Sequence, residues 1–108
     1  MATLVKKRTD AQTARIYAAL KCAYPELSSD ESDVVYKYNS YSIRVRVVTN
    51  AFESKTLAER ETQLKRILAT LAAEDRENIT MLMMLTPEDA AERDLMNVEF
   101  DNPGRNRF

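Results

Sequence analysis

The side chains that could carry chemistry in this 108-residue chain are carboxylates, lysines, arginines and one thiol. Histidine is absent, which excludes Ser-His-Asp and Cys-His catalysis and every metal site that needs an imidazole ligand. The only glycine is Gly104, so glycine-rich loops that cradle phosphates are excluded as well. The remaining carboxylates and lysines show no recognisable catalytic spacing. We therefore expect a protein that is not an enzyme and needs no cofactor or metal, with a small enzyme of unknown reaction as the least favoured alternative.

The one cysteine, Cys22, cannot form a disulfide within the chain. It falls within the first predicted helix, where a cysteine more often serves as a small buried side chain than as a reactive thiol. We expect Cys22 to be buried and inert.

Basic residues are concentrated in the middle of the chain, where they could contact phosphates: Arg44, Arg46, Lys55, Arg60, Lys65 and Arg66. Together with neighbouring tyrosines, the first two could form a sheet face on which single-stranded nucleic acid stacks. Those tyrosines are Tyr36, Tyr38 and Tyr41. The formal net charge of -1 gives no general reason to expect polyanion binding. Solvated charge on a strand, with tyrosines packed at its edge, is the alternative interpretation.

A nearly continuous apolar run near the C-terminal end is the strongest candidate for a partner-binding surface. In a strand its residues alternate between faces, so either Met81 and Met83 or Leu82 and Met84 point away from the helices. Methionine clusters adapt to varied partners, and an exposed apolar patch commonly marks an interface. We predict that these four residues contact a protein partner or a second copy. The alternative is a core strand whose second face is covered by residues 95–100.

The loop at residues 50–55 leads into a predicted helix and is a third candidate site. Phe52 is expected to anchor this loop in the core, with Asn50 turning it. Lys55 and Arg60 could instead receive an acidic partner or a phosphate beside the helix N-terminus. The sequence leaves both roles open.

Around this loop, the sequence predicts a strand and an amphipathic helix. Apolar and charged residues alternate from Ser42 to Thr49, which is typical of a strand with one buried face. Thr56 and Glu59 then have the spacing of a capping box. The helix that follows carries an apolar stripe made of Leu57, Leu64, Ile67, Leu68 and Leu71. We expect it to end near residue 73, before a charged segment.

The rest of the chain supplies two further helices and two strands. A helix is expected over about residues 10–23, with Thr9 and Gln12 as its capping box. Strands are predicted at 34–38 and 79–85; the first forms a hairpin with the strand from Ser42, and the second follows the middle helix as a parallel crossover. Thr86 caps a last helix that reaches about residue 95.

These elements predict one α+β domain of order α-β-β-α-β-α, in which helices pack on one face of a three-stranded mixed sheet and leave the other face open. The domain is expected at residues 9–100, between a flexible basic tail at 1–8 and a flexible C-terminal tail at 101–108. No apolar run approaches the roughly 20 residues that cross a bilayer, and the start lacks a signal-peptide core. We expect a cytoplasmic protein that does not contact membranes.

The stretch Val47-Val-Thr-Asn-Ala-Phe-Glu-Ser-Lys-Thr-Leu-Ala-Glu-Arg60, followed by an apolar strand and Thr86-Pro-Glu88, resembles the core of the BolA-like proteins. The resemblance covers about residues 14–93. It implies a small α+β domain related to the type II KH fold, with the same element order. It also implies a non-enzymatic protein that works through protein contacts as a regulator or homodimer, with nucleic-acid binding as the alternative.

The chain departs from the family at several chemical positions. BolA-like proteins usually carry glycine where Ser54 stands and histidine where Glu61 stands, and they use a histidine near the third strand as a candidate iron ligand. Because this chain has no histidine, the family's iron–sulfur partnership with monothiol glutaredoxins is carried over to no residue here. The Gly-x-x-Gly clamp of KH domains is absent too.

Overall fold

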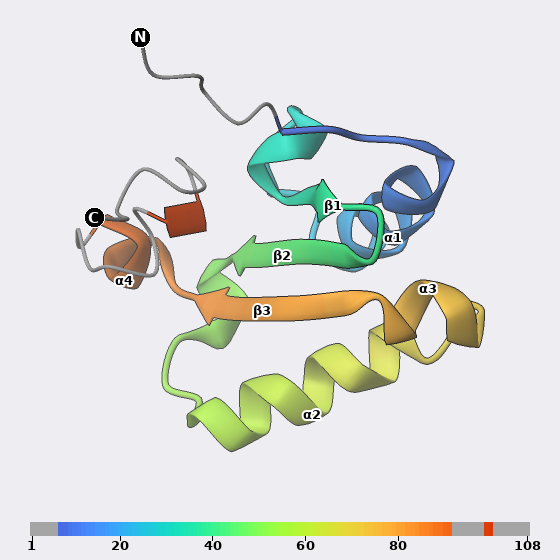
Figure 1. Ribbon diagram of the computed structural model, residues 1–108. Helices are drawn as coiled ribbons and strands as arrows, with labels where there is room; N and C mark the ends of the chain where they lie inside the picture. The colour runs from blue at the N-terminus through green and yellow to red at the C-terminus, as the bar shows by residue number, and fades with distance from the viewer. Residues whose placement is uncertain (1–6, 92–98, 101–108) are drawn as a thin grey trace, which may run out of the picture.

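A computed structural model describes residues 7–91 and 99–100 (Figure 1). Its helices are α1 (Ala11–Ala23), α2 (Leu57–Leu68), α3 (Ala73–Glu77) and α4 (Pro87–Ala91), with short 3-10 turns at Glu31–Asp33 and Asn50–Phe52. Its strands are β1 (Val35–Asn39), β2 (Ser42–Val48) and β3 (Ile79–Leu85). The predicted α+β fold is confirmed, and α3 is an additional short helix. The predicted extension of the last helix to about residue 95 lies outside the described residues.

The three strands form one mixed sheet in the order β1-β2-β3. β1 and β2 pair antiparallel as the predicted hairpin, and at its tip the Tyr41 amide donates to Asn39 Oδ1 at 2.8 Å. β2 and β3 pair parallel, with Val45 opposite Leu82 and Val47 opposite Met84. The predicted crossover through a helix is thereby confirmed, because parallel neighbours require a long connection.

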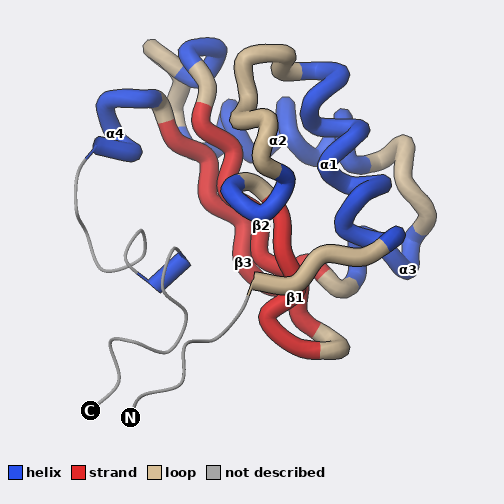
Figure 2. The backbone as a smooth tube through the Cα atoms, turned by 90° about the horizontal axis from the view of Figure 1, so that it is seen from above, coloured by secondary structure: helices blue, strands red, loops and turns tan. Residues whose placement is uncertain are grey.

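The main core lies between the sheet and two helices on one face, as predicted (Figure 2). α1 contributes Ile16 and Leu20, and α2 contributes Leu64 and Leu68. The sheet contributes fully buried apolar side chains at alternate positions of β2, which are Ile43, Val45 and Val47. The alternate side chains of β2 and the apolar stripe of α2 therefore pack together in one core layer.

The second face of the sheet is not open over its centre. Phe100 is fully buried there, with its ring 5.0 Å from that of Tyr36 in an edge-to-face arrangement. Tyr36 is also fully buried, and its hydroxyl donates to the Phe100 carbonyl at 2.9 Å. Met83 completes this second cluster. The expectation of an uncovered face is wrong at this point, and the alternative of a second face covered by residues 95–100 is confirmed for Phe100, which buries apolar area there.

The predicted capping box of α2 is confirmed, and that of α1 is displaced by one residue. The Glu59 amide donates to Thr56 Oγ1 at 3.2 Å, and the Thr56 amide donates to Glu59 Oε1 at 2.8 Å. At α1 the N-cap is Asp10, not Thr9, and its partner is Thr13. Asp10 is favoured because its carboxylate also pairs with Lys37 on β1, at 2.8 Å.

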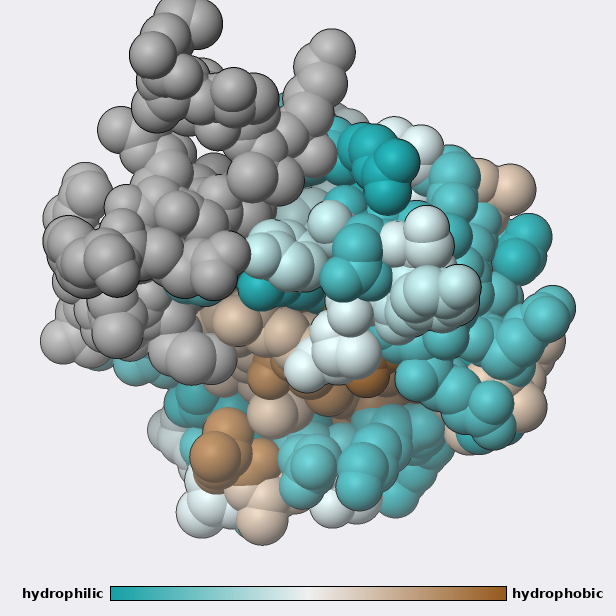
Figure 3. Space-filling model, in the orientation of Figure 1, coloured by the Kyte–Doolittle hydropathy of each residue, from teal (hydrophilic) through white to brown (hydrophobic). Residues whose placement is uncertain are grey.

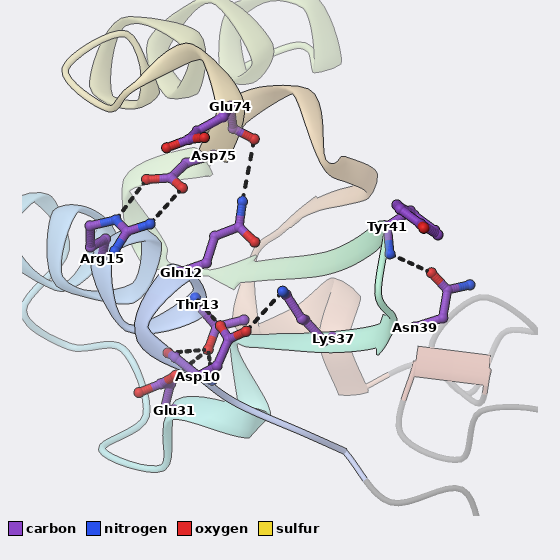
Figure 4. Close-up of polar contacts among 10 residues, drawn as sticks. All are labelled: Asp10, Gln12, Thr13, Arg15, Glu31, Lys37, Asn39, Tyr41, Glu74 and Asp75. Atoms are coloured by element: carbon purple, nitrogen blue, oxygen red, sulfur yellow. Dashed lines mark hydrogen bonds and ion pairs between the residues drawn. The ribbon is translucent and has the colours of Figure 1, made fainter.

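The charged segment after α2, for which the sequence predicts no helix, folds as α3 because polar contacts hold it against α1 (Figure 4). Arg15 donates through two nitrogens to the two carboxylate oxygens of Asp75, each at 2.9 Å. The Asp75 side chain is only 1% exposed, and the hydrogen bonds from Arg15 lower its pKa. Gln12 adds a hydrogen bond to the Glu74 carbonyl at 3.3 Å. α2 accordingly ends at Leu68 and not near residue 73.

Two predicted burials are also wrong. Cys22 lies exposed on α1, because the buried stripe of this helix runs through Thr13, Ile16 and Leu20. Leu57, predicted to belong to the buried stripe of α2, is 66% exposed. Among the described residues, no helix is long and apolar enough to cross a membrane.

Candidate interaction surface at the edge of strand β3

β3 is an edge strand, and its outer edge pairs with no other strand among the described residues. In a parallel ladder, alternate residues direct their amide and carbonyl to the neighbouring strand, and the residues between them direct theirs outward. The Leu85 carbonyl accepts from the Thr49 amide, which assigns Leu85 and Met83 to the ladder with β2. Leu82 and Met84 therefore direct their backbone groups to the outer edge.

A shallow groove of about 450 Å³ runs beside this edge, between β3 and the C-terminal half of α2; we call it the β3 groove. Figure 3 shows an apolar band in this region, bordered by hydrophilic residues. The residues that line the groove are Lys65, Leu68, Arg76, Ile79, Thr80, Met81 and Leu82. Thr80 is exposed, whereas Ile79, Met81 and Leu82 are half-buried. The groove thus combines an unpaired strand edge with an apolar floor and a basic rim.

The side of α2 that brings Lys65 to the groove also carries an ion pair and, beyond the end of the groove, an exposed leucine. Lys65 Nζ lies 3.6 Å from Glu61 Oε2, four residues earlier, so both side chains occupy one side of the helix. Leu57 precedes Glu61 by another four residues and therefore lies on the same side. This side is apolar at its first turn, acidic in the middle and basic toward its end.

Arg60 closes the C-terminal end of the β3 edge. Its Nη1 donates to the Met84 carbonyl at 2.9 Å and to Asp89 Oδ2 at 3.1 Å, while Nε donates to the Lys55 carbonyl at 3.2 Å. The pKa of Asp89 is lowered by the Thr86 amide and then by Arg60. The Arg60 guanidinium thus joins the loop, the strand edge and α4 through contacts within the chain.

The structure separates the four residues predicted to bind a partner. Leu82 and Met84 pack toward the helices, whereas Met81 and Met83 belong to the second face. Met83 and Met84 are only 6% and 8% exposed. Met81 and Leu82 line the β3 groove from either side of the strand. These residues therefore expose the edge of β3 and do not form a continuous methionine surface on one face of the sheet.

The structure also places the six basic residues on different sides of the sheet. Arg44 lies on the second face, 3.0 Å from Glu99 and with its guanidinium 3.9 Å from the centre of the Tyr38 ring. The Arg46 guanidinium stacks 4.4 Å from the Phe100 ring on that face. Lys65 and Arg66 are exposed on α2, which covers the opposite face. Tyr36 is buried, and Tyr41 projects from the hairpin tip at 80% exposure.

In the loop at residues 50–55, the predicted role of Phe52 as a core anchor is confirmed. Its side chain is fully buried and packs against Tyr24. Thr49 starts the loop; its hydroxyl accepts from the Ala51 amide and donates to Glu26. Ser54 has a φ of 64°, in the left-handed region that favours glycine. Lys55 is exposed at the end of the loop. The loop therefore serves mainly to position α2 beside β3.

Glu61, which pairs with Lys65 on α2, and the groove residues Arg76 and Thr80 were not among the sequence-predicted sites. A signal for the first was present in the spacing of Glu61 and Lys65, and Thr80 is the only polar residue in the apolar run. Arg76 had no such signal, because its position depends on the packing of α3.

The described residues contain no group of three or more carboxylate or cysteine side chains placed to hold a metal ion. Comparisons with models of known protein families, with curated proteins and with solved structures find no match to this chain.

Proposed function

We propose that this protein is a non-enzymatic, BolA-like protein that acts through protein–protein contacts, and that the β3 groove receives the partner. The observation that carries the proposal is the unpaired outer edge of β3 beside an apolar groove. An extended segment of polypeptide can pair with such an edge through its backbone and place alternate side chains in the neighbouring groove. The floor formed by Ile79 and Leu82 favours apolar side chains in that segment.

The BolA-like part of the proposal is supported by the loop before α2. Ser54, at the position where the family carries glycine, adopts a φ of 64°, which is the conformation that glycine accommodates without strain. Phe52 is buried and the order of the elements agrees with the family's fold. These agreements concern the scaffold; they assign no iron–sulfur or transcriptional role to any residue.

The proposal is tested by selecting peptides from a displayed random library on the immobilised protein. We expect enriched peptides with alternating apolar residues. Thr80→Lys should weaken their binding at least about tenfold, because it places a charge on an exposed strand edge. Thr62→Lys adds the same charge on a different side of α2, away from the groove, and should leave binding unchanged. Failure to enrich any peptide, or equal affinity for both variants, would contradict the proposal.

A further inference from the structure

We propose that the occupant of the β3 groove is a second copy of this chain, bound by antiparallel pairing of the two β3 edges about a two-fold axis. This inference rests on the proposed function, since it assigns a partner to the same surface. Its three supports are the backbone of β3, the position of Leu57 and the distribution of charge along α2.

The backbone of β3 can pair with its own copy. Leu82 lies in the middle of the strand and directs its amide and carbonyl outward. In an antiparallel pair centred on this residue, the Leu82 amide of each copy donates to the Leu82 carbonyl of the other. A strand that pairs with itself in this way generates a closed, isologous dimer, in which the sheets of the two copies become continuous.

The two-fold axis brings an exposed leucine to an apolar groove. α2 runs antiparallel to β3, because Arg60 near its start contacts Met84, whereas Lys65 and Leu68 lie beside the first half of the strand. Leu57 is consequently beyond the end of the groove in its own chain. The axis carries Leu57 of the second copy to the opposite end, beside Ile79 of the apolar floor. Each copy then buries the leucine of the other, as an isologous interface requires.

Charge along α2 is complementary under the same rotation. The two α2 helices lie antiparallel across the axis, so Glu61 of one copy faces the basic rim of the other. That rim consists of Lys65 and Arg76, which line the groove. Opposite charges therefore meet twice, once on each side of the axis. A partner without this arrangement of acidic and basic residues would form only some of these ion pairs.

The test is the mass of the full chain in solution, measured by sedimentation velocity over a wide concentration range. We expect a species of twice 12.4 kDa. Leu57→Ser should raise its dissociation constant at least about tenfold, because it removes a leucine that each copy buries in the other. Tyr41→Ser alters the other large exposed hydrophobic residue, at the hairpin tip, and should leave the constant unchanged. A dimer indifferent to Leu57→Ser would overturn the inference.

Charge reversal tests the two-fold arrangement directly. Glu61→Lys places a lysine opposite the basic rim, and Lys65→Glu places a glutamate opposite Glu61 of the other copy, so each variant should dimerise at least about tenfold more weakly than wild type. Mixing the two variants should restore dimers that contain one copy of each, detected by native mass spectrometry. A statistical mixture or no mixed dimer would overturn the inference.

The outcome separates this inference from the proposed function. A chain that stays monomeric at all concentrations but still binds selected peptides in a Thr80-dependent manner would exclude the second copy and keep the protein-contact function. A monomer that also enriches no peptide would contradict both.

Discussion

The two edges of the sheet differ in how they are protected. On the β1 edge, the Lys37 amide donates to the Arg8 carbonyl at 2.7 Å, and the Lys37 ammonium pairs with Asp10. The strand is also irregular between Lys37 and Asn39. On the β3 edge, the described residues offer only Arg60 at the Met84 carbonyl, at the C-terminal end.

This difference indicates which edge of the sheet can pair with a strand of another molecule. Natural sheets protect exposed edges with lysine, irregular pairing or covering segments, because unpaired amides and carbonyls attract other strands. β1 has all three devices. The pairing of β3 is irregular near its start, between Ile79 and Met81, and Arg60 covers the Met84 carbonyl, so within the described structure the apolar middle of the strand is the part without such a device. We infer that the β3 edge is left available for a partner.

The largest effect is expected for Arg60→Ala, which removes the protection at the end of β3. We expect the free energy of unfolding to fall by about 2–3 kcal/mol, because the Met84 carbonyl and the Lys55 carbonyl lose a charged donor. Urea denaturation measures the change. Arg66→Ala, at an exposed position of the same helix, is the control and should stay within about 0.5 kcal/mol. Equal stability of the two variants would show that Arg60 does not hold the strand edge.

A smaller loss is expected at the other edge. Asp10→Ala removes both the N-cap of α1 and the partner of Lys37, and should cost about 1 kcal/mol of unfolding free energy. Thr9→Ala, which alters the cap suggested by sequence spacing, should change stability by less than about 0.5 kcal/mol. Thermal and urea denaturation distinguish the two. A larger loss for Thr9→Ala would assign the cap to Thr9.

The loop that positions α2 beside β3 should tolerate a stabilising change. Ser54→Gly relieves a left-handed conformation, and we expect a gain of about 0.5 kcal/mol after the added flexibility of the unfolded chain is counted. Ser54→Val should be destabilising, because a branched side chain is disfavoured at positive φ. Denaturation of both variants tests the pair, and a loss for Ser54→Gly would contradict the assigned backbone.

The smallest effect concerns pH. The Lys37 ammonium lowers the pKa of Asp10 below its ordinary value of 3.8, and the Thr86 amide followed by Arg60 lowers that of Asp89. A lowered carboxyl pKa contributes stability that is complete above the ordinary value and is lost as pH falls through the lowered one. Unfolding free energy should therefore fall below about pH 4. Asp10→Asn should show a shallower fall, and identical slopes for the variant and wild type would contradict the assignment.

Several features of the candidate site could not be obtained from sequence, for reasons visible at particular residues. Leu57 and Leu64 belong to the same apolar stripe, yet Leu64 is fully buried and Leu57 is 66% exposed. Thr9 and Asp10 are both good N-caps by type. Asp10 is selected by Lys37, which comes from a strand 27 residues later. Such choices depend on residues that are distant in sequence.

The strands, the hairpin, the crossover and the capping box of α2 could be predicted from the sequence. Those features depend on side-chain alternation and on hydrogen bonds between near neighbours, so a short window contains all their causes. The tertiary packing places Phe100 on the second face and holds α3 through Arg15 and Asp75. It also covers one edge of the sheet and, among the described residues, leaves the other without a neighbouring strand. A strand lies at an edge when no other strand pairs with it on one side. That depends on where every other segment packs.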